Sequence, residues 1–291
     1  MNDHLWSRSA SMGSKNRKPK KTRMSRNADK HVLYQKSVQA PVPDVHFLRR
    51  AYKQTFDRKP TILREDFCGT AAVCAEWVRK TKDSVAYGVD LDQSTLDWGT
   101  IHNVDELTEE QQSRVHLING DVRTVKTPKA DVIAAENFSY CIFKERSSLR
   151  EYYRGVYENL AEDGILVCDL FGGYESIEDD RREETEHDDF TYVWDQAKFN
   201  PITHDALFHI HFKFPDGSKI YRAFTYEWRL WTIPEVRELM LEAGFDRADV
   251  YWEESDDKSG EGTGKFIKTD AGDSDPAWIA YIVGVKSSAS N

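Results

Sequence analysis

The chain has 291 residues and a net charge of −10, with 39% apolar and 12% aromatic residues. This length supports one large domain or two small ones with a sizeable core. The longest apolar stretches, such as residues 278–285, are too short to span a bilayer, and no signal peptide is apparent. The four cysteines are scattered without a C-x-x-C pair, so we expect free thiols, a cytoplasmic location and no membrane partner.

Charge divides the sequence into a basic N-terminal segment and an acidic remainder. Residues 1–30 hold nine Lys or Arg against two Asp, so the rest of the chain carries −17. An acidic body repels nucleic-acid phosphates, and we therefore do not expect nucleic acid as a partner. Residues 1–30 lack apolar periodicity and are predicted to be a disordered tail. Their basic run could also serve as a nucleic-acid arm or a nuclear address.

Residues 31–291 are predicted to form an α/β domain that begins with helices. Residues 31–58 have helical periodicity, with Asp44 as the expected N-cap of the later helix. Apolar strands then alternate with amphipathic helices, which indicates a parallel sheet covered on both faces. The expected strands are 61–65, 85–91, 115–122, 130–138 and 165–171, and the helices between them are 70–81, 93–104 and 145–164.

A segment of different character begins after Gly172 and Gly173. Alternating residues predict antiparallel strands, with a Pro-Asp-Gly hairpin turn at 215–217. Residues 232–245 return to helix, and the segment 254–276 is expected to be a flexible loop between two closing strands. We therefore predict a Rossmann-like, doubly wound, mostly parallel seven-stranded sheet with an antiparallel insertion at 174–231.

Polar side chains end four consecutive predicted strands. The residues concerned are Glu65 and Asp66, then Asp90, then Asp121, then Glu136 and Asn137. The carboxyl ends of parallel strands meet at one edge of a sheet, where ligands bind. An acid after the second strand is the usual acceptor for ribose hydroxyls, and the third acid can accept from adenine N6. The chain lacks the GxGxxG and GxxxxGK[ST] phosphate loops, so a nucleoside with an amino-acid arm fits better than NAD or ATP.

In the order and spacing of these motifs, residues 60–290 resemble the class I S-adenosylmethionine-dependent methyltransferases. Glu65 matches the acidic position of the family's first motif, and Gly69 matches its middle glycine. Phe67 and Ala71 stand where the family has its two other glycines. The later matches are Asp90 and Leu91 at the ribose, Asp121 and Val122 at the adenine, and Asn137 and Phe138 where cofactor and substrate meet.

The resemblance implies that S-adenosylmethionine is the cofactor and S-adenosylhomocysteine the product. It implies cofactor contacts from Glu65, Cys68, Gly69, Thr70, Asp90, Leu91, Asp121, Val122, Asn137 and Phe138. Glu65 is assigned to the methionine amine, whereas Asp66 is expected to be structural. Helices 31–58 would form a lid, and Tyr34 and Tyr140 would contact the substrate. No catalytic side chain is assigned, because an in-line methyl transfer mainly requires alignment of the reactants.

The function implied is methyl transfer to the nitrogen, oxygen or sulfur of a small molecule, with a homodimer formed through the insertion. One alternative is a nucleic-acid or protein methyltransferase that docks through the basic tail. Another is a non-catalytic binding module with this fold. No metal site is expected, because His204, His209 and His211 have no evident further ligands in the sequence.

Overall fold

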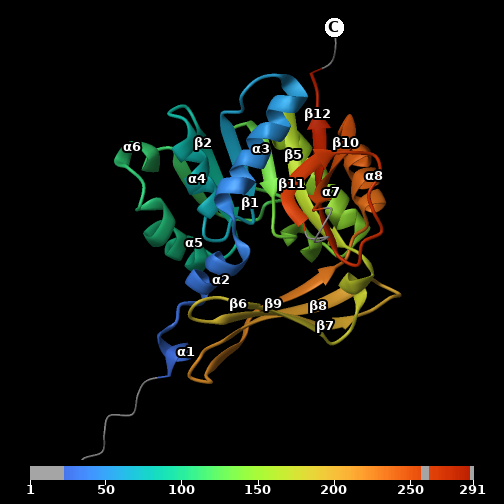
Figure 1. Cartoon of the computed structure of the whole chain (residues 1–291). Coiled ribbons are helices and arrows are strands. Elements are labelled where there is room, and N and C mark those ends of the chain that lie inside the picture. The colour runs from blue at the N-terminus through green and yellow to red at the C-terminus, as the bar shows by residue number, and fades with distance from the viewer. Residues whose placement is uncertain (1–22, 257–261, 289–291) are drawn as a thin grey trace, which may run out of the picture.

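The computed structural model describes residues 23–256 and 262–288, which form two β-sheets with helices around the larger one (Figure 1). The larger sheet has the strand order β11-β10-β12-β5-β4-β1-β2-β3. Neighbours from β5 to β3 pair in parallel, whereas β12 pairs antiparallel with β5. The strands are β1 Ile62–Asp66, β2 Val85–Asp90, β3 Val115–Asn119, β4 Ala130–Ala135, β5 Leu160–Gly172, β10 Arg247–Ser255, β11 Gly262–Lys268 and β12 Trp278–Lys286.

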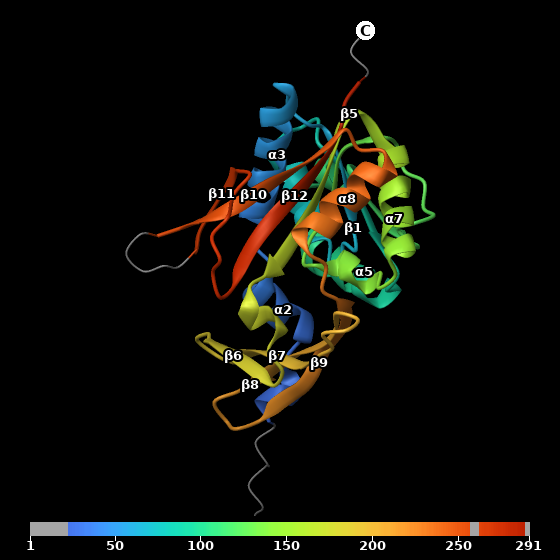
Figure 2. The same ribbon diagram turned by 90° about the vertical axis from the view of Figure 1, so that its right-hand side faces the viewer.

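Helices cover both faces of this sheet (Figure 2). Helices α3 (Pro41–Phe56) and α4 (Ala72–Lys80) bury Leu48 and Trp77 against one face. Helices α7 (Arg146–Asn159) and α8 (Ile233–Ala243) pack on the other face. The shorter elements are α5 Gln93–Gly99, the π-helical η1 Thr100–Val104, α6 Glu109–Gln112, and the 3-10 turns η2 Ser139–Ile142 and η3 Tyr174–Ile177. The predicted doubly wound α/β architecture is confirmed.

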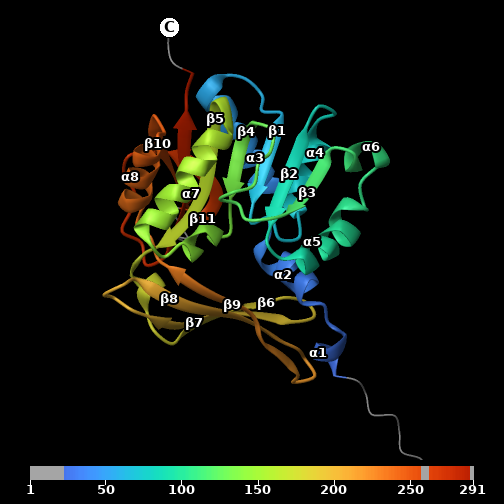
Figure 3. The same cartoon turned by 180° about the vertical axis from the view of Figure 1, so that it is seen from behind.

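The second sheet is antiparallel and lies beyond the carboxyl ends of the parallel strands (Figure 3). Its order is β6-β7-β8-β9, and its strands are β6 Arg181–Glu186, β7 Thr191–Phe199, β8 Asp205–Lys213 and β9 Lys219–Arg229. The expected hairpin turn joins β8 to β9, where Gly217 has φ +77° and the Phe214 N–H donates to the Ser218 carbonyl at 2.9 Å.

The N-terminal segment departs from its prediction. Residues 24–27 form helix α1 (Met24–Asn27), whose first main-chain N–H donates to the Asp216 carboxylate at 2.8 Å. Helix α2 (Lys30–Val38) follows directly and buries Leu33 against the antiparallel sheet. The predicted disorder of residues 1–30 is therefore wrong for residues 24–30. Apart from Arg23, the other basic residues of the tail lie outside the part of the chain that the structure describes.

Three further boundaries differ from the sequence-based expectations. Helix α3 begins at Pro41 after Ala40, so Asp44 lies in its first turn and is not the N-cap. Helix α7 ends at Asn159, because Leu160 already pairs with Ala130, and Gly164 lies inside β5. Part of the expected flexible loop is strand β11, which pairs with β10, so the sheet has eight strands in the described residues and not seven.

Among the residues that the structure describes, no helix is both long and apolar enough to cross a membrane. All four cysteines are buried and free of disulfide bonds.

Candidate active site

The loop after β1 has an unusual backbone conformation at the three positions where the methyltransferase motif has glycines. Phe67, Gly69 and Ala71 have φ values of 58°, 51° and 58°. This left-handed region is easily reached only by glycine, since other residues bring Cβ too close to the backbone. The Ala71 N–H donates to the Cys68 carbonyl at 2.8 Å and closes the turn. The chain therefore keeps the glycine-type loop geometry with two non-glycine residues.

Phe67 has a packing role that accounts for its size. Its ring lies 6.0 Å from the ring of Phe143 and 5.9 Å from that of Tyr152, measured between centroids. The side chain thus points from the loop into the core between α7 and the sheet. This burial offsets the conformational cost at a position where a small residue is expected.

Asp90 ties the loop to the end of β2. One carboxylate oxygen accepts from the Gly69 N–H at 2.8 Å, and the other accepts from the Asp92 N–H at 2.9 Å. Leu91 follows with 68% of its surface exposed, which is unusual for a large apolar residue beside a polar group. The structure thus brings together a fixed carboxylate and an uncovered apolar side chain, as the sequence predicts for a ribose and its base.

Asp121, the acid that follows β3, is already paired with the side chain of Arg123. Arg123 Nη2 lies 2.6 Å from Asp121 Oδ2, and this guanidinium lowers the pKa of the Asp121 carboxyl. The Val122 side chain is buried beside the strand. Asp121 can therefore accept from an adenine amine only through a lone pair that Arg123 leaves available.

Of the two acids that end β1, only Glu65 faces the other ligand-edge carboxyls. Asp66 is bound by Arg64 Nε at 2.6 Å and by the Tyr152 hydroxyl at 2.9 Å, in the core on the opposite face of the sheet. Burial raises the pKa of Asp66, while Arg64 and Tyr152 oppose that shift. Glu65 accepts from the Cys74 N–H at 3.0 Å and also interacts with the Cys74 thiol. This geometry agrees with the expected structural role of Asp66.

Four acidic side chains lie close enough to influence one another on the α3 face of the sheet. They are Asp44 from α3, Glu65 from β1, Glu136 after β4 and Asp169 from β5. We call this group the carboxyl cluster. Burial raises the pKa of Asp44 to about 6, of Asp169 to about 7 and of Glu65 to about 8, and mutual repulsion adds to the shifts of Glu65 and Asp169.

Glu136 is the least satisfied member of the carboxyl cluster. It is only 8% exposed, and neither of its carboxyl oxygens has a hydrogen-bond partner. Burial raises its pKa well above the usual value, with repulsion from Asp44 and Asp169 as further causes. Buried polar atoms in native structures almost always have partners, so an orphaned carboxyl indicates a missing donor.

Sequence reasoning missed Asp44, Glu136 and Asp169 as members of one group. Asp44 was assigned to a helix cap, and Glu136 was noted only as the polar end of a strand. Asp169 interrupts the apolar run "ILVCDLF", and such an acid inside a buried strand was a usable signal.

Asp169 also holds the turn after β4. Its two carboxylate oxygens accept the Asn137 N–H at 2.7 Å and the Phe138 N–H at 2.8 Å. Both residues have φ 57°, so the turn is fixed in a strained conformation that directs their side chains towards the second sheet.

Helix α2 closes over the cofactor loop. Gln35 Nε2 donates to Thr70 Oγ1 at 3.0 Å, and the Thr70 hydroxyl donates to Gln39 Oε1 at 3.2 Å. Cys68, the neighbouring loop residue, is only 1% exposed and packs in the core. Of the helices 31–58 expected as a lid, α2 therefore contacts this loop, whereas α3 packs on the face of the sheet.

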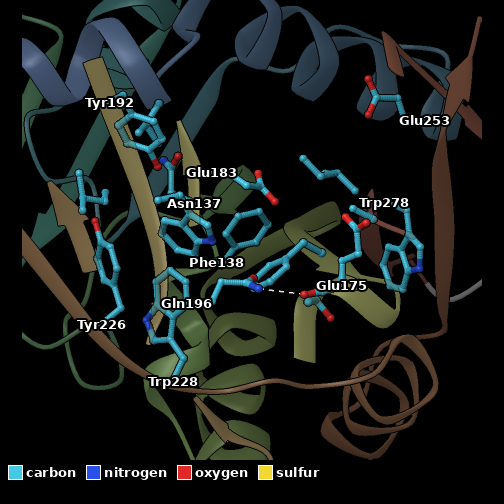
Figure 4. A pocket seen from close by; sticks show the side chains of 18 of the residues that line it. Asn137, Phe138, Glu175, Glu183, Tyr192, Gln196, Tyr226, Trp228, Glu253 and Trp278 are labelled. Carbon is cyan, nitrogen blue, oxygen red and sulfur yellow. Dashed lines mark hydrogen bonds between the residues drawn. The ribbon is translucent and has the colours of Figure 1, made fainter. Parts of the chain in front are cut away.

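A cavity of about 360 Å³ lies between the β4 turn and the antiparallel sheet (Figure 4). Tyr34 of α2 and Phe138 line it, and Tyr34 is hydrogen-bonded to Tyr226 of β9. The other aromatic side chains that line it are Phe171, Tyr192, Trp194, Trp228 and Trp278. Its volume is within the range of small-molecule sites.

Tyr140 does not reach this cavity. It is completely buried, and its hydroxyl donates to the Asp169 carbonyl at 2.9 Å. The predicted substrate contact of Tyr140 is therefore wrong, because the side chain turns into the core under η2.

Solved methyltransferase structures share this architecture. CalS10 with bound S-adenosylmethionine, an amino pentose methyltransferase from Micromonospora echinaspora, has a TM-score of 0.62 at 13% identity, over 88% of this chain and 96% of that one. The sugar N-methyltransferase KedS8 from a Streptoalloteichus species has a TM-score of 0.60 at 15% identity, over 98% and 100%. An S-adenosylmethionine-dependent methyltransferase from Clostridium acetobutylicum has a TM-score of 0.58 at 16% identity, over 87% and 96%.

No family model and no curated protein sequence matches this chain. At these levels of identity the structural similarity concerns the fold. Together with the strand order, it shows that the chain has the fold of the class I S-adenosylmethionine-dependent methyltransferases.

Proposed function

We propose that this protein is an enzyme that transfers a methyl group from S-adenosylmethionine to a small molecule. The observation that carries the proposal is the Gly69–Asp90 hydrogen bond at the carboxyl edge of a methyltransferase-type sheet, together with an aromatic cavity that Asn137 and Phe138 line at the same edge. A carboxylate placed for a nucleoside and a space for the acceptor are the two parts that such a transfer requires.

The residues at the sheet edge fit this cofactor. Its ammonium and sulfonium groups are cationic, and the carboxyl cluster offers carboxyl groups that can ionise beside a cation, with two unpartnered oxygens on Glu136. Asp90 is held in place to accept from ribose hydroxyls, and the exposed Leu91 offers an apolar contact for the adenine. When bound, the cofactor supplies an electrophilic methyl group on a positively charged sulfur.

The chain's own contribution is alignment and exclusion of water. Asn137 and Phe138 stand at the border between the sheet edge and the cavity, and Asp169 fixes their backbone. Tyr34 covers the cavity from α2, and burial raises the pKa of Tyr34 to about 12, so its hydroxyl stays protonated. Held in this way, an acceptor atom can approach in line with the bond that breaks.

Calorimetric titration with S-adenosylhomocysteine and S-adenosylmethionine tests the proposal. We expect saturable binding of both, and none of NAD or ATP at the same concentrations, because the loop has no phosphate-binding motif. Absence of binding by both sulfur compounds would rule the proposal out. Binding without turnover of any acceptor would favour the non-catalytic module.

The tail-docking alternative can be tested by removing residues 1–22 only. Residues 24 and 25 bond to Asp216 and Ser218, so a longer deletion would also disturb the fold. For a small-molecule enzyme, cofactor affinity and turnover should be unchanged by this truncation. Loss of turnover together with a loss of salt-sensitive nucleic-acid binding would favour the alternative.

We also propose that any homodimer forms through the antiparallel sheet, as its exposed strand edges allow. The edge strand β6 carries six polar residues, "RREETE", which oppose pairing with a second strand. The other edge, β9, exposes Tyr221 and is the better candidate. Sedimentation of the wild type and of Tyr221→Lys should show dissociation in the variant.

A further inference from the structure

Aromatic side chains form the largest group in the walls of the cavity. Aromatic side chains from both sheets and the β4 turn surround it, with Tyr192, Tyr226 and Trp228 on the antiparallel sheet and Trp278 on β12 (Figure 4). Trp228 stacks on Tyr226 with 4.5 Å between ring centroids, so these rings form a continuous surface. Ring faces carry partial negative charge and attract cations.

The charged side chains of the same walls are all acidic. Glu175, Glu183 and Glu253 line the cavity, and no Lys, Arg or His does so among the described residues. Arg181, which is not part of the lining, pairs with both Glu175 and Glu183, with 2.9 Å between its Nε and Glu183 Oε1. One guanidinium against three carboxylates leaves an excess of negative charge around the cavity.

We propose that the methyl acceptor is a hydrophobic organic amine, which binds in this cavity as a cation and carries no phosphate or carboxylate group. This inference rests on the proposed function and narrows its acceptor. A cation is attracted by the ring faces and by the acidic rim, whereas an anion would be buried beside carboxylates without any neutralising side chain.

The transfer balances with such an acceptor. The ammonium form first loses a proton to water, which frees the nitrogen lone pair. The nitrogen forms a bond to the methyl carbon with this pair, while the electron pair of the carbon–sulfur bond stays on sulfur and neutralises the sulfonium. The methylated nitrogen is again cationic, so the aromatic walls stabilise acceptor and product alike.

Binding of a matched probe series to the full chain tests the inference without turnover. The probes are phenethylamine, phenethyltrimethylammonium, phenethyl alcohol and hydrocinnamate, which share a phenyl ring and differ in charge. Quenching of tryptophan fluorescence reports binding, since Trp194, Trp228 and Trp278 line the cavity. We expect the two cations to bind about tenfold more tightly than the alcohol, and hydrocinnamate to bind most weakly.

Glu183→Gln removes one rim charge from a half-exposed side chain and should not disturb folding. It should weaken the two cationic probes severalfold and leave phenethyl alcohol unchanged. Glu186→Gln is the matched control, because Glu186 lies on the same strand outside the cavity lining and should change nothing. Tyr192→Leu should reduce the preference for cations by removing one ring.

Equal binding of all probes, absence of binding, or preference for hydrocinnamate would overturn the inference. A titration with S-adenosylhomocysteine on the same sample separates this failure from failure of the proposed function. Cofactor binding without a preference for cations would refute only the acceptor class. Preference for cations without cofactor binding would refute the methyltransferase proposal and, with it, the role of the bound amine as a methyl acceptor.

Discussion

The main-chain N–H of Gly69 donates to the Asp90 carboxylate at 2.8 Å, and this bond joins the loop after β1 to the end of β2. The second oxygen of Asp90 is held by the Asp92 N–H, so the carboxylate has little rotational freedom. A carboxylate fixed in this way is preorganised for a ligand and also stabilises the loop that would surround it.

Asp90→Ala should therefore weaken S-adenosylhomocysteine binding by about tenfold to a hundredfold, the range expected for lost hydrogen bonds to a charged group. Calorimetry measures this change directly. Asp97→Asn is the control, because Asp97 is an exposed residue of the following helix. If the affinity of Asp90→Ala equals that of the wild type, the cofactor does not use the end of β2.

The carboxyl cluster predicts a pH dependence of stability. Burial raises the pKa of Glu65 from 4.5 to about 8, so the folded protein retains a proton that the unfolded chain loses. The contribution of Glu65 to the free energy of unfolding is fully present below about pH 4.5 and is lost as the pH rises to about 8. The loss is at most about 1.4 kcal/mol per pH unit. Asp169 acts in the same direction up to about pH 7.

Urea unfolding at a series of pH values measures this loss. Glu65→Gln should flatten the decline, because glutamine can still accept the Cys74 N–H but has no proton to lose. Glu106→Gln, at an exposed position, serves as the control and should preserve the wild-type slope. An unchanged slope in Glu65→Gln would show that Glu65 is ionised in the folded protein at all these pH values.

The same cluster predicts proton release on cofactor binding. A cationic ammonium beside Glu136 and Glu65 would favour their ionised forms, so protons must leave as the ligand binds. At neutral pH, the calorimetric heat should depend on the ionisation enthalpy of the buffer, and less so in Glu65→Gln. Identical heats in all buffers would show that the ammonium group of the cofactor binds away from Glu65 and Glu136.

The sequence was sufficient for the order of the buried strands and of the helices that cover them, and it predicts the edge at which the candidate site lies. Apolar runs such as residues 130–135 and 165–171 leave little choice but buried parallel strands, and the polar residues Glu136 and Asn137 after the first of these runs mark the expected ligand edge. Strand β11 was missed because "GTGKFIK" is mostly polar and exposed, so only its pairing with β10 defines it. Local patterns carry no information about such long-range pairing.

The carboxyl cluster could not be predicted because it depends on how distant elements pack. Asp44 joins it through the placement of α3 across the sheet, and Asp169 through the register of β5. Tyr140 was misassigned for a related reason. It follows the β4 turn that the sequence marks, but it lies in the 3-10 turn η2 with its side chain in the core.

The buried ion pair of Arg64 and Asp66 predicts a large effect on stability. Both side chains are completely buried, and their Nε and Oδ1 atoms are 2.6 Å apart. Asp66→Ala would leave a buried guanidinium without its counter-charge and should cost about 3–5 kcal/mol in the free energy of unfolding. Urea unfolding measures the loss, and Glu110→Ala, which removes an exposed carboxylate paired with Arg114, should have little effect. A similarly small loss in Asp66→Ala would contradict the buried pair.

Ala71→Gly tests the strained cofactor loop. The substitution removes one buried methyl group, but it also relieves a left-handed backbone that costs about 1–2 kcal/mol for a residue with Cβ. Ala75→Gly is the matched control, since Ala75 is equally buried in the interior of α4, where glycine is unfavourable by about 1 kcal/mol. We expect Ala71→Gly to be at least about 1 kcal/mol more stable than Ala75→Gly in urea unfolding. Because both variants lose the same methyl group, equal stabilities would mean that the loop is not strained at Ala71, and that the absence of glycine there has no energetic cost.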